Sequence, residues 1–275
     1  MRSSFALRAT VTFFAWSLLL LPVNAASESD LDDLVDAIGL PELMEILRIE
    51  GMSKSEELRQ SMFPNRAGGW GTIASSIYET DRMLTTFREA FDAELTNEDV
   101  APVLGFLRSD LGTRIIELEV GARRALLDPL AEQAAKDSLD SLTEVNPERV
   151  AIVLEFVEVN DLLELNVAGG LNASLAFYKG LVAGGLELTE SEMLEQVWAQ
   201  EPDIRDEIEE WMSAYLIMAY EPLTDEEIRE YIILSTTDVG KDLNRALFVG
   251  FDALFDQLSF ALGLAASQYS ASEDI

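Results

Sequence analysis

The chain of 275 residues contains neither histidine nor cysteine. Without histidine it lacks the most common general base, the Ser-His-Asp and Cys-His nucleophile arrangements, and the usual histidine ligands of zinc and iron. Without cysteine it has no thiol nucleophile, no thiolate metal centre and no disulfide. The enzyme classes that remain rely on paired carboxylates, on a Ser-Lys pair, or on calcium held by oxygens. The sequence therefore favours a non-enzymatic function, and it predicts no catalytic residue, metal site or cofactor.

Basic residues are also scarce, since 19 lysines and arginines stand against 51 acids and the net charge is −32. Such a surface repels nucleic acid phosphates and anionic lipid headgroups. The closest approach to a basic patch is Arg123-Arg124. We therefore expect no nucleic acid partner. Solvation of a secreted protein is the favoured explanation of the charge, and a loose divalent-cation buffer or an acidic adaptor is a further possibility.

Proline is infrequent, with eight residues in the chain, and the hydrophobic fraction is 48%. This composition indicates a globular protein whose core is packed without disulfides. No segment shows convincing strict alternation of apolar and polar residues, so strands are expected to be minor or absent. The predicted fold is all-α.

The first 25 residues resemble a secretory signal peptide. Arg2 and Arg8 form a positive start, residues 13–21 form an apolar run, and Val23-Asn24-Ala25 gives a small-residue cleavage pattern. Cleavage would leave a mature chain from Ala26, whose charge of −34 reflects the loss of two arginines and no acid. The alternative is an uncleaved anchor, but the apolar stretch of about 15 residues is short of the roughly 20 that span a bilayer. We expect an exported, periplasmic protein with no transmembrane span after cleavage.

A short phrase occurs twice, and corresponding positions are 128 residues apart. The repeated positions are Leu95, Thr96, Glu98, Ser109 and Gly112 in the first copy, and Leu223, Thr224, Glu226, Thr237 and Gly240 in the second. The same offset aligns Trp70 with Trp198 and Phe87 with Tyr215, so the register extends upstream of the phrase. The sequence therefore predicts two related helical repeats in a bundle-like architecture, which are either separate domains or parts of one core. The predicted bounds are 1–25 for the signal peptide, 26–142 for the first repeat and 143–275 for the second.

Within each copy the phrase predicts a helix, a tight corner and a second helix. Thr224 with Glu227 forms a capping box pattern, and Thr96 with Asp99 forms a weaker one. Longer helices are predicted upstream over residues 73–93 and 204–220, and downstream over 113–127 and 241–264. Acids along the last of these argue against a membrane span.

Other positions of the repeat are given structural roles. Gly51 and Gly170 follow short leucine-rich helices and are predicted to be helix C-caps. Trp70 and Trp198 are predicted to lie in the core between helices rather than to stack on a ligand.

The phrase Leu-Thr-x-Glu, an apolar helix and then Ser/Thr-x-x-Gly-Lys resembles the exported bacterial family named "domain of unknown function 2059", apparently in two copies. The family's corner usually reads Ser-Pro-x-Gly followed by Lys or Gln, whereas this chain has Asp110 and Asp238 in place of proline and Thr113 in place of the basic residue. The resemblance implies a helical, exported bacterial protein. It designates no catalytic residue.

Two acidic clusters, Glu207 to Glu210 and Asp225 to Glu227, are interpreted as solvated helix faces rather than as a calcium site or an acid/base pair. The leading hypothesis is a non-enzymatic binding or interaction module for an apolar ligand or an envelope protein, because helix pairs that leave apolar faces uncovered form grooves. The alternative is a carboxylate-dependent hydrolase acting on cell-envelope material.

Overall fold

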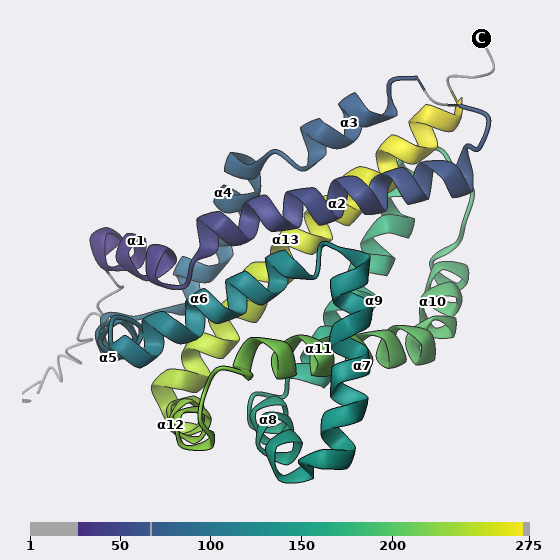
Figure 1. Cartoon of the computed structure of the whole chain (residues 1–275). Helices are drawn as coiled ribbons and strands as arrows, with labels where there is room; N and C mark the ends of the chain where they lie inside the picture. Colours follow the sequence, from purple (N-terminus) through teal and green to yellow (C-terminus); the bar gives the residue numbers. More distant parts are fainter. Residues whose placement is uncertain (1–26, 67, 272–275) are drawn as a thin grey trace, which may run out of the picture.

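The computed structural model describes residues 27–66 and 68–271, in which all regular elements are helices (Figure 1). The all-α prediction is confirmed, and the predicted signal peptide lies outside the described residues. The elements of the first part are α1 (Glu28–Ala37), α2 (Leu40–Met62), α3 (Trp70–Ile77), α4 (Thr80–Phe91), the 3-10 helix η1 (Asp92–Glu94), α5 (Asn97–Leu107), α6 (Asp110–Ala125) and α7 (Pro129–Val145). They are followed by α8 (Pro147–Val159), α9 (Leu162–Ala183), α10 (Glu190–Ala199), α11 (Glu201–Tyr220), α12 (Asp225–Thr236) and α13 (Asp238–Ala271).

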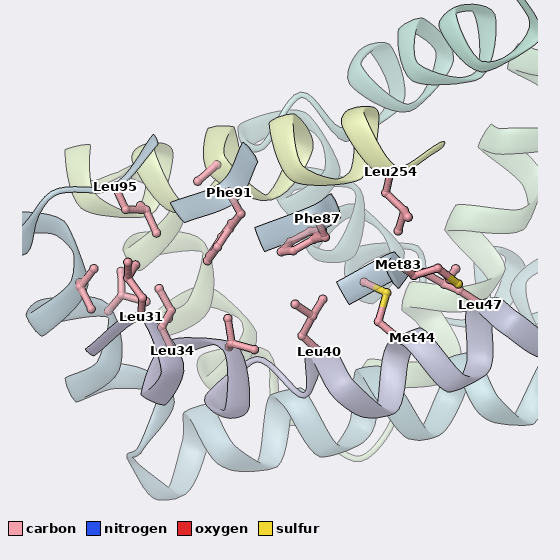
Figure 2. Packing of buried hydrophobic residues seen from close by; sticks show 14 of the residues in the cluster. Leu31, Leu34, Leu40, Met44, Leu47, Met83, Phe87, Phe91, Leu95 and Leu254 are labelled. Atoms are coloured by element: carbon pink, nitrogen blue, oxygen red, sulfur yellow. The ribbon is translucent and has the colours of Figure 1, made fainter. Parts of the chain in front are cut away.

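The long helix α13 runs diagonally through the molecule and contacts α3, α4, α5, α9 and α12 (Figure 1). Its residues Leu254 and Leu258 belong to the largest apolar cluster, together with side chains of α1, α2, α4 and α5. Figure 2 shows Leu47 of α2, Met83 of α4 and Leu254 of α13 converging at one end of this cluster. The cluster therefore joins residues from both predicted repeats in one core.

A second apolar cluster lies among α6, α8, α11 and α12 and includes the fully buried Ile115, Tyr220 and Ile228. The predicted boundary between residues 142 and 143 falls inside α7. Since α7 packs on both α8 and α11, it belongs to the same layer as the helices that follow it.

The repeated phrase has the same local geometry in both copies. The carboxylates of Asp99 and Glu227 accept hydrogen bonds from the backbone N–H of Thr96 and Thr224, which closes the predicted capping boxes of α5 and α12. At the second corner, the hydroxyl of Ser109 accepts from the N–H of Gly112 at 3.1 Å. The hydroxyl of Thr237 accepts from the N–H of Gly240 at 3.0 Å. The predicted helix starts are therefore correct.

Glycine is required at these corners by the close approach of backbone. A Cβ added at Gly112 would lie 2.1 Å from the carbonyl oxygen of Phe106, and one added at Gly240 would lie 2.2 Å from that of Leu234. Both values are shorter than any allowed contact. The matching glycines therefore reflect matching corners, while duplication of the whole halves remains a prediction.

Upstream of the phrase the two halves differ, and the single helix predicted over residues 73–93 is wrong. The chain breaks after α3 at Tyr78, and the carboxylate of Glu79 then caps α4 by accepting from the N–H of Arg82 at 3.0 Å. The break is hidden in the sequence because apolar residues continue on both sides of it. The corresponding break in the second half lies at Gln200, between α10 and α11.

The predicted C-caps at Gly51 and Gly170 are also wrong, since both residues lie inside helices, in α2 and α9. Gly51 allows close packing instead, because a Cβ there would lie 2.2 Å from the ring of Tyr78. At Gly170 the nearest side chain is that of Ile204. A neighbouring element thus explains glycines that a local pattern assigns to helix ends.

The two aligned tryptophans have different environments. Trp70 is 1% exposed and donates from its indole N–H to the backbone oxygen of Ser55 at 2.9 Å, as predicted for a core residue. Trp198 is 64% exposed, so its predicted place in the core is wrong. The reason is that α10 is a peripheral helix that packs on α9 and α11 alone among the closely packed neighbours of the described chain.

By length and composition, α13 is the one helix of the described residues that qualifies to cross a membrane. Apolar core helices of soluble proteins meet the same criteria, so this is weak evidence. Five other helices surround α13, and four aspartates lie along it, at positions 238, 242, 252 and 256.

Candidate functional site

A cavity of about 470 Å³ lies between the two apolar clusters. Its walls come from α2, α6, α8, α9, α11, α12 and α13, which are helices of both predicted repeats. Small-molecule sites in proteins are typically clefts of a few hundred to 1,000 Å³ with mainly apolar walls and few polar groups. The cavity has both properties.

Leucine and phenylalanine form most of the lining. The apolar lining residues are Leu43, Leu47, Phe156, Leu162, Leu165, Ala173, Leu216, Leu234, Leu243, Leu247, Phe248, Phe251 and Phe255. Gly169, Gly170 and Gly240 line it as well, so at these places backbone, rather than a side chain, faces the open space.

Glu119 is the acid on the inner face of α6. The residues Gly112, Ile115 and Ala122 of that helix are buried, and Glu119 continues their helical stripe at i+4 from Ile115 and i−3 from Ala122. The amphipathic pattern that anchors α6 thus turns a carboxyl group inward, where it lines the cavity.

Two tyrosines of α11 fix Glu119. The hydroxyl of Tyr220 donates to Oε1 of Glu119 at 2.6 Å, and the hydroxyl of Tyr215 donates to the backbone oxygen of Glu119 at 3.2 Å. Tyr220 is fully buried and packs edge-on against Phe156, with ring centroids 5.7 Å apart. Oε2 of Glu119 accepts no hydrogen bond within the described chain, and it is not among the atoms sealed from solvent. This oxygen is therefore open to the cavity.

Burial raises the pKa of the Glu119 carboxyl from 4.5 to about 7, and the hydrogen bond from Tyr220 partly opposes this shift. Burial also raises the pKa of Tyr215, Tyr220 and Tyr231, and the nearby Glu119 adds to the rise. The tyrosines therefore remain protonated donors near neutral pH. The carboxyl group can be either neutral or charged there, depending on what occupies the cavity.

Arg123 is the one basic residue that lines the cavity, and its charge is already paired. Its Nε donates to Oε1 of Glu50 at 3.0 Å and its Nη2 donates to Oε2 at 2.7 Å, which is a two-pronged ion pair with α2. The guanidinium also lies over the ring of Trp211, 4.7 Å from its centroid. These contacts hold Arg123 away from the role of counter-ion to Glu119.

Asparagines close the corner between α8 and α9. Asn160 donates from its side chain to the backbone oxygen of Phe156 at 2.9 Å, and Asn244 of α13 donates to the backbone oxygen of Asn160 at 3.0 Å. The next residue, Asp161, has φ of 52°, a left-handed conformation that is uncommon for residues other than glycine. The side-chain N–H groups of this corner are therefore committed to the backbone.

A second carboxyl group lines the cavity at Asp252 of α13. A Cβ added at Gly169 would lie 2.9 Å from its Oδ1, so the glycine leaves room for the carboxylate. Burial and the charge of Asp256 raise the pKa of Asp252. Asp252 also borders a smaller neighbouring hollow, which Lys241 and Arg245 line as well.

The acidic clusters interpreted as solvated faces lie outside the cavity. Glu207, Glu209 and Glu210 are exposed, and Glu210 pairs with Lys136. Asp225 pairs with the buried Arg149 at 2.6 Å. Within residues 27–66 and 68–271, no group of three or more acids is arranged to hold a metal ion.

The repeat positions predicted from the sequence serve structure. Leu95 and Leu223 are buried, Thr96 and Thr224 cap helices, and Glu226 is exposed. The side chain of Glu98 lies outside the described part of the structure. Of the predicted positions, Gly240 is the one that lines the cavity.

Sequence reasoning missed Glu119, although a signal was present. An acid on the apolar stripe of a predicted helix, one turn after Ile115, is the pattern that would have found it. The position 128 residues later is Leu247, which also lines the cavity. The two aligned positions thus supply one acid and one apolar side chain to the same space.

Comparison with known proteins gives a family match and no function. No curated protein and no solved structure matches the chain. The family model described as "Uncharacterized protein conserved in bacteria (DUF2059)" matches residues 81–140, which run from the start of α4 into α7. The match covers the first copy of the phrase, so the second family copy stays a prediction. Residues 81–140 therefore belong to the bacterial DUF2059 family, as the phrase at Leu95 to Gly112 indicates.

Proposed function

We propose that this protein is an exported, periplasmic binding protein for one small apolar ligand. The observation that carries the proposal is the cavity of about 470 Å³, whose walls are mainly leucine and phenylalanine from seven helices. Export rests on the signal-peptide pattern of the first 25 residues.

The packing of the helices favours an internal site. Apolar side chains that border an empty space lose the dispersion contacts that would stabilise them, so a ligand that fills the space recovers those contacts. Filling a large part of a cavity of this size suits a molecule of roughly ten to twenty non-hydrogen atoms.

A filled cavity tests the proposal. Ala173 lines the cavity on α9, whereas Ala168 on the same helix is exposed. The experiment titrates the mature chain with the neutral fluorescent probe N-phenyl-1-naphthylamine. Ala173→Phe should weaken binding about tenfold or more, and Ala168→Phe should leave it unchanged, with the helical circular dichroism of both variants checked. Absence of saturable binding to the wild type, or equal effects of the two variants, would refute the proposal.

A carboxylate-dependent hydrolase is a second candidate, favoured by one observation: Glu119, with a pKa of about 7, shares the cavity with Asp252. A general acid near neutral pH needs such a pKa. Glycan chains, however, bind in open polar clefts, whereas these walls are apolar. Hydrolysis of cell-wall glycan that is lost in Glu119→Gln would support the enzyme over the binding protein.

A further inference from the structure

The charges around the cavity are unequal in a way that specifies the ligand. Glu119 presents a free oxygen to the space, and Asp252 adds a second carboxyl group from α13. The one basic lining residue, Arg123, is bound to both carboxylate oxygens of Glu50. The lining therefore has acidic groups without free cations.

We propose that the ligand is a cationic amphiphile whose positively charged nitrogen binds at the carboxyl group of Glu119 while its apolar body fills the space between α9 and α13. This inference rests on the proposed binding function and names the chemical class of its ligand. A fatty acid or another anionic amphiphile would place its charge beside two carboxyl groups in an apolar surround and is disfavoured.

The groups around Glu119 are compatible with a cation. Tyr220 holds Oε1 and leaves Oε2 open, and the ring of Tyr231 lines the same wall. Aromatic faces attract cations, which adds to the attraction of the carboxylate. The lining contributed by α8 and α9 has no charged residue, so the charged groups facing the space are Glu119, Arg123 and Asp252.

Binding of a permanent cation should depend on pH. Since the empty cavity raises the pKa of Glu119 to about 7, the carboxyl group is largely neutral at pH 5.5 and largely charged at pH 8. Affinity for a cation should increase across this range, with contributions from Asp252, whose pKa is also raised. A neutral ligand should show little change.

Three ligands with the same decyl chain test the proposal by displacement of the naphthylamine probe, below the concentrations at which they form micelles. They are decyltrimethylammonium, decanol and decanoate. At pH 8 the wild type should bind the ammonium about tenfold or more tightly than decanoate, and this preference should shrink at pH 5.5. In Glu119→Gln the preference should fall to about twofold.

The control separates the cavity from the acidic surface. Glu117→Gln removes the same charge from an exposed position of α6 and should keep the wild-type preference and pH dependence. If decanoate binds as tightly as the ammonium, or if Glu119→Gln and Glu117→Gln behave alike, the inference is wrong. If neither the probe nor decanol binds at all, the proposed function itself fails. Binding of decanol with no preference between the charged ligands overturns the ligand class alone.

Discussion

At the scale of single residues, Glu119 is the position where stability and binding conflict. Its carboxyl group is held by Tyr220 inside an apolar wall, and burial raises its pKa to about 7. In the unfolded chain the same group has a pKa near 4.5. The folded protein therefore keeps a proton that the unfolded chain releases between these two values, and the stability of the fold decreases as the pH rises through this window.

Glu119→Gln should remove this pH dependence. Below pH 4.5 the carboxyl group is neutral in both states, so the variant should have a stability close to that of the wild type. By pH 7.5 the variant should be more stable by on the order of 2 to 3 kcal/mol, because the glutamine cannot ionise and can still accept from Tyr220. Urea unfolding across this range measures the difference. An unchanging difference between wild type and variant would show that the carboxyl group titrates normally.

Single residues also show where sequence reasoning reaches its limit. The caps at Thr96 and Thr224 are local, since both partners lie within four residues, and they were predictable. The exposure of Trp198 and the burial of Glu119 depend on which helices pack together, which no local pattern specifies. The roles of Gly51 and Gly170 inside helices have the same origin.

At the scale of elements, the two corners before α6 and α13 set the direction of the helices that line the cavity. Each corner combines a hydroxyl cap, at Ser109 or Thr237, with a glycine that touches the carbonyl of the preceding helix. The corner fixes α6, which carries Glu119, and α13, which carries Asp252. The repeated phrase thus contributes to the site through geometry.

Alanine at either corner should destabilise the protein. Gly112→Ala and Gly240→Ala each place a Cβ about 2 Å from a carbonyl oxygen, and relief of such a clash typically costs about 1 to 3 kcal/mol. Gly121→Ala in α6 is the matched control, since no atom lies within 4 Å of its added Cβ. That control should be neutral or stabilising by up to about 1 kcal/mol. Chemical denaturation compares the three variants, and a corner variant as stable as the control would contradict the close approach.

Helix type and most helix positions were predictable from periodicity, including α11 and the long α13. The break between α3 and α4 was not, because the apolar pattern continues through Tyr78 while the cap at Glu79 interrupts the helix. The cavity could be anticipated only as a groove between helices. Its position requires the packing of seven helices, which lies beyond the reach of one element's pattern.

At the scale of the whole molecule, α13 connects the predicted repeats. Its Ala246, Leu254 and Leu258 pack with Leu34, Phe87 and other side chains of the first repeat in the largest cluster. The helix also packs closely on α9, where a Cβ at Gly263 would lie 2.0 Å from the backbone oxygen of Phe177. The core therefore crosses the predicted boundary at residues 142 and 143.

The two halves should not fold independently. The mature chain, residues 26–275, should unfold in one cooperative transition, because removing α13 leaves Phe87 and Leu34 uncovered. Fragments 26–142 and 143–275 should each lack a sharp thermal transition by circular dichroism and should regain it when mixed. Sharp, independent melting of both fragments would show instead that the repeats are separate domains.

The central claim is that one small apolar molecule occupies the space between the helices of the two halves. A crystal structure of the mature protein grown with a bromine-labelled decanol tests it most directly, since the anomalous signal of bromine reports position without interpretation of side-chain density. We predict one strong bromine peak within the cavity, bounded by Leu47 of α2, Ala173 of α9 and Leu247 of α13. Bromine on the outer surface with the cavity empty, or a cavity closed by its own side chains, would contradict the account.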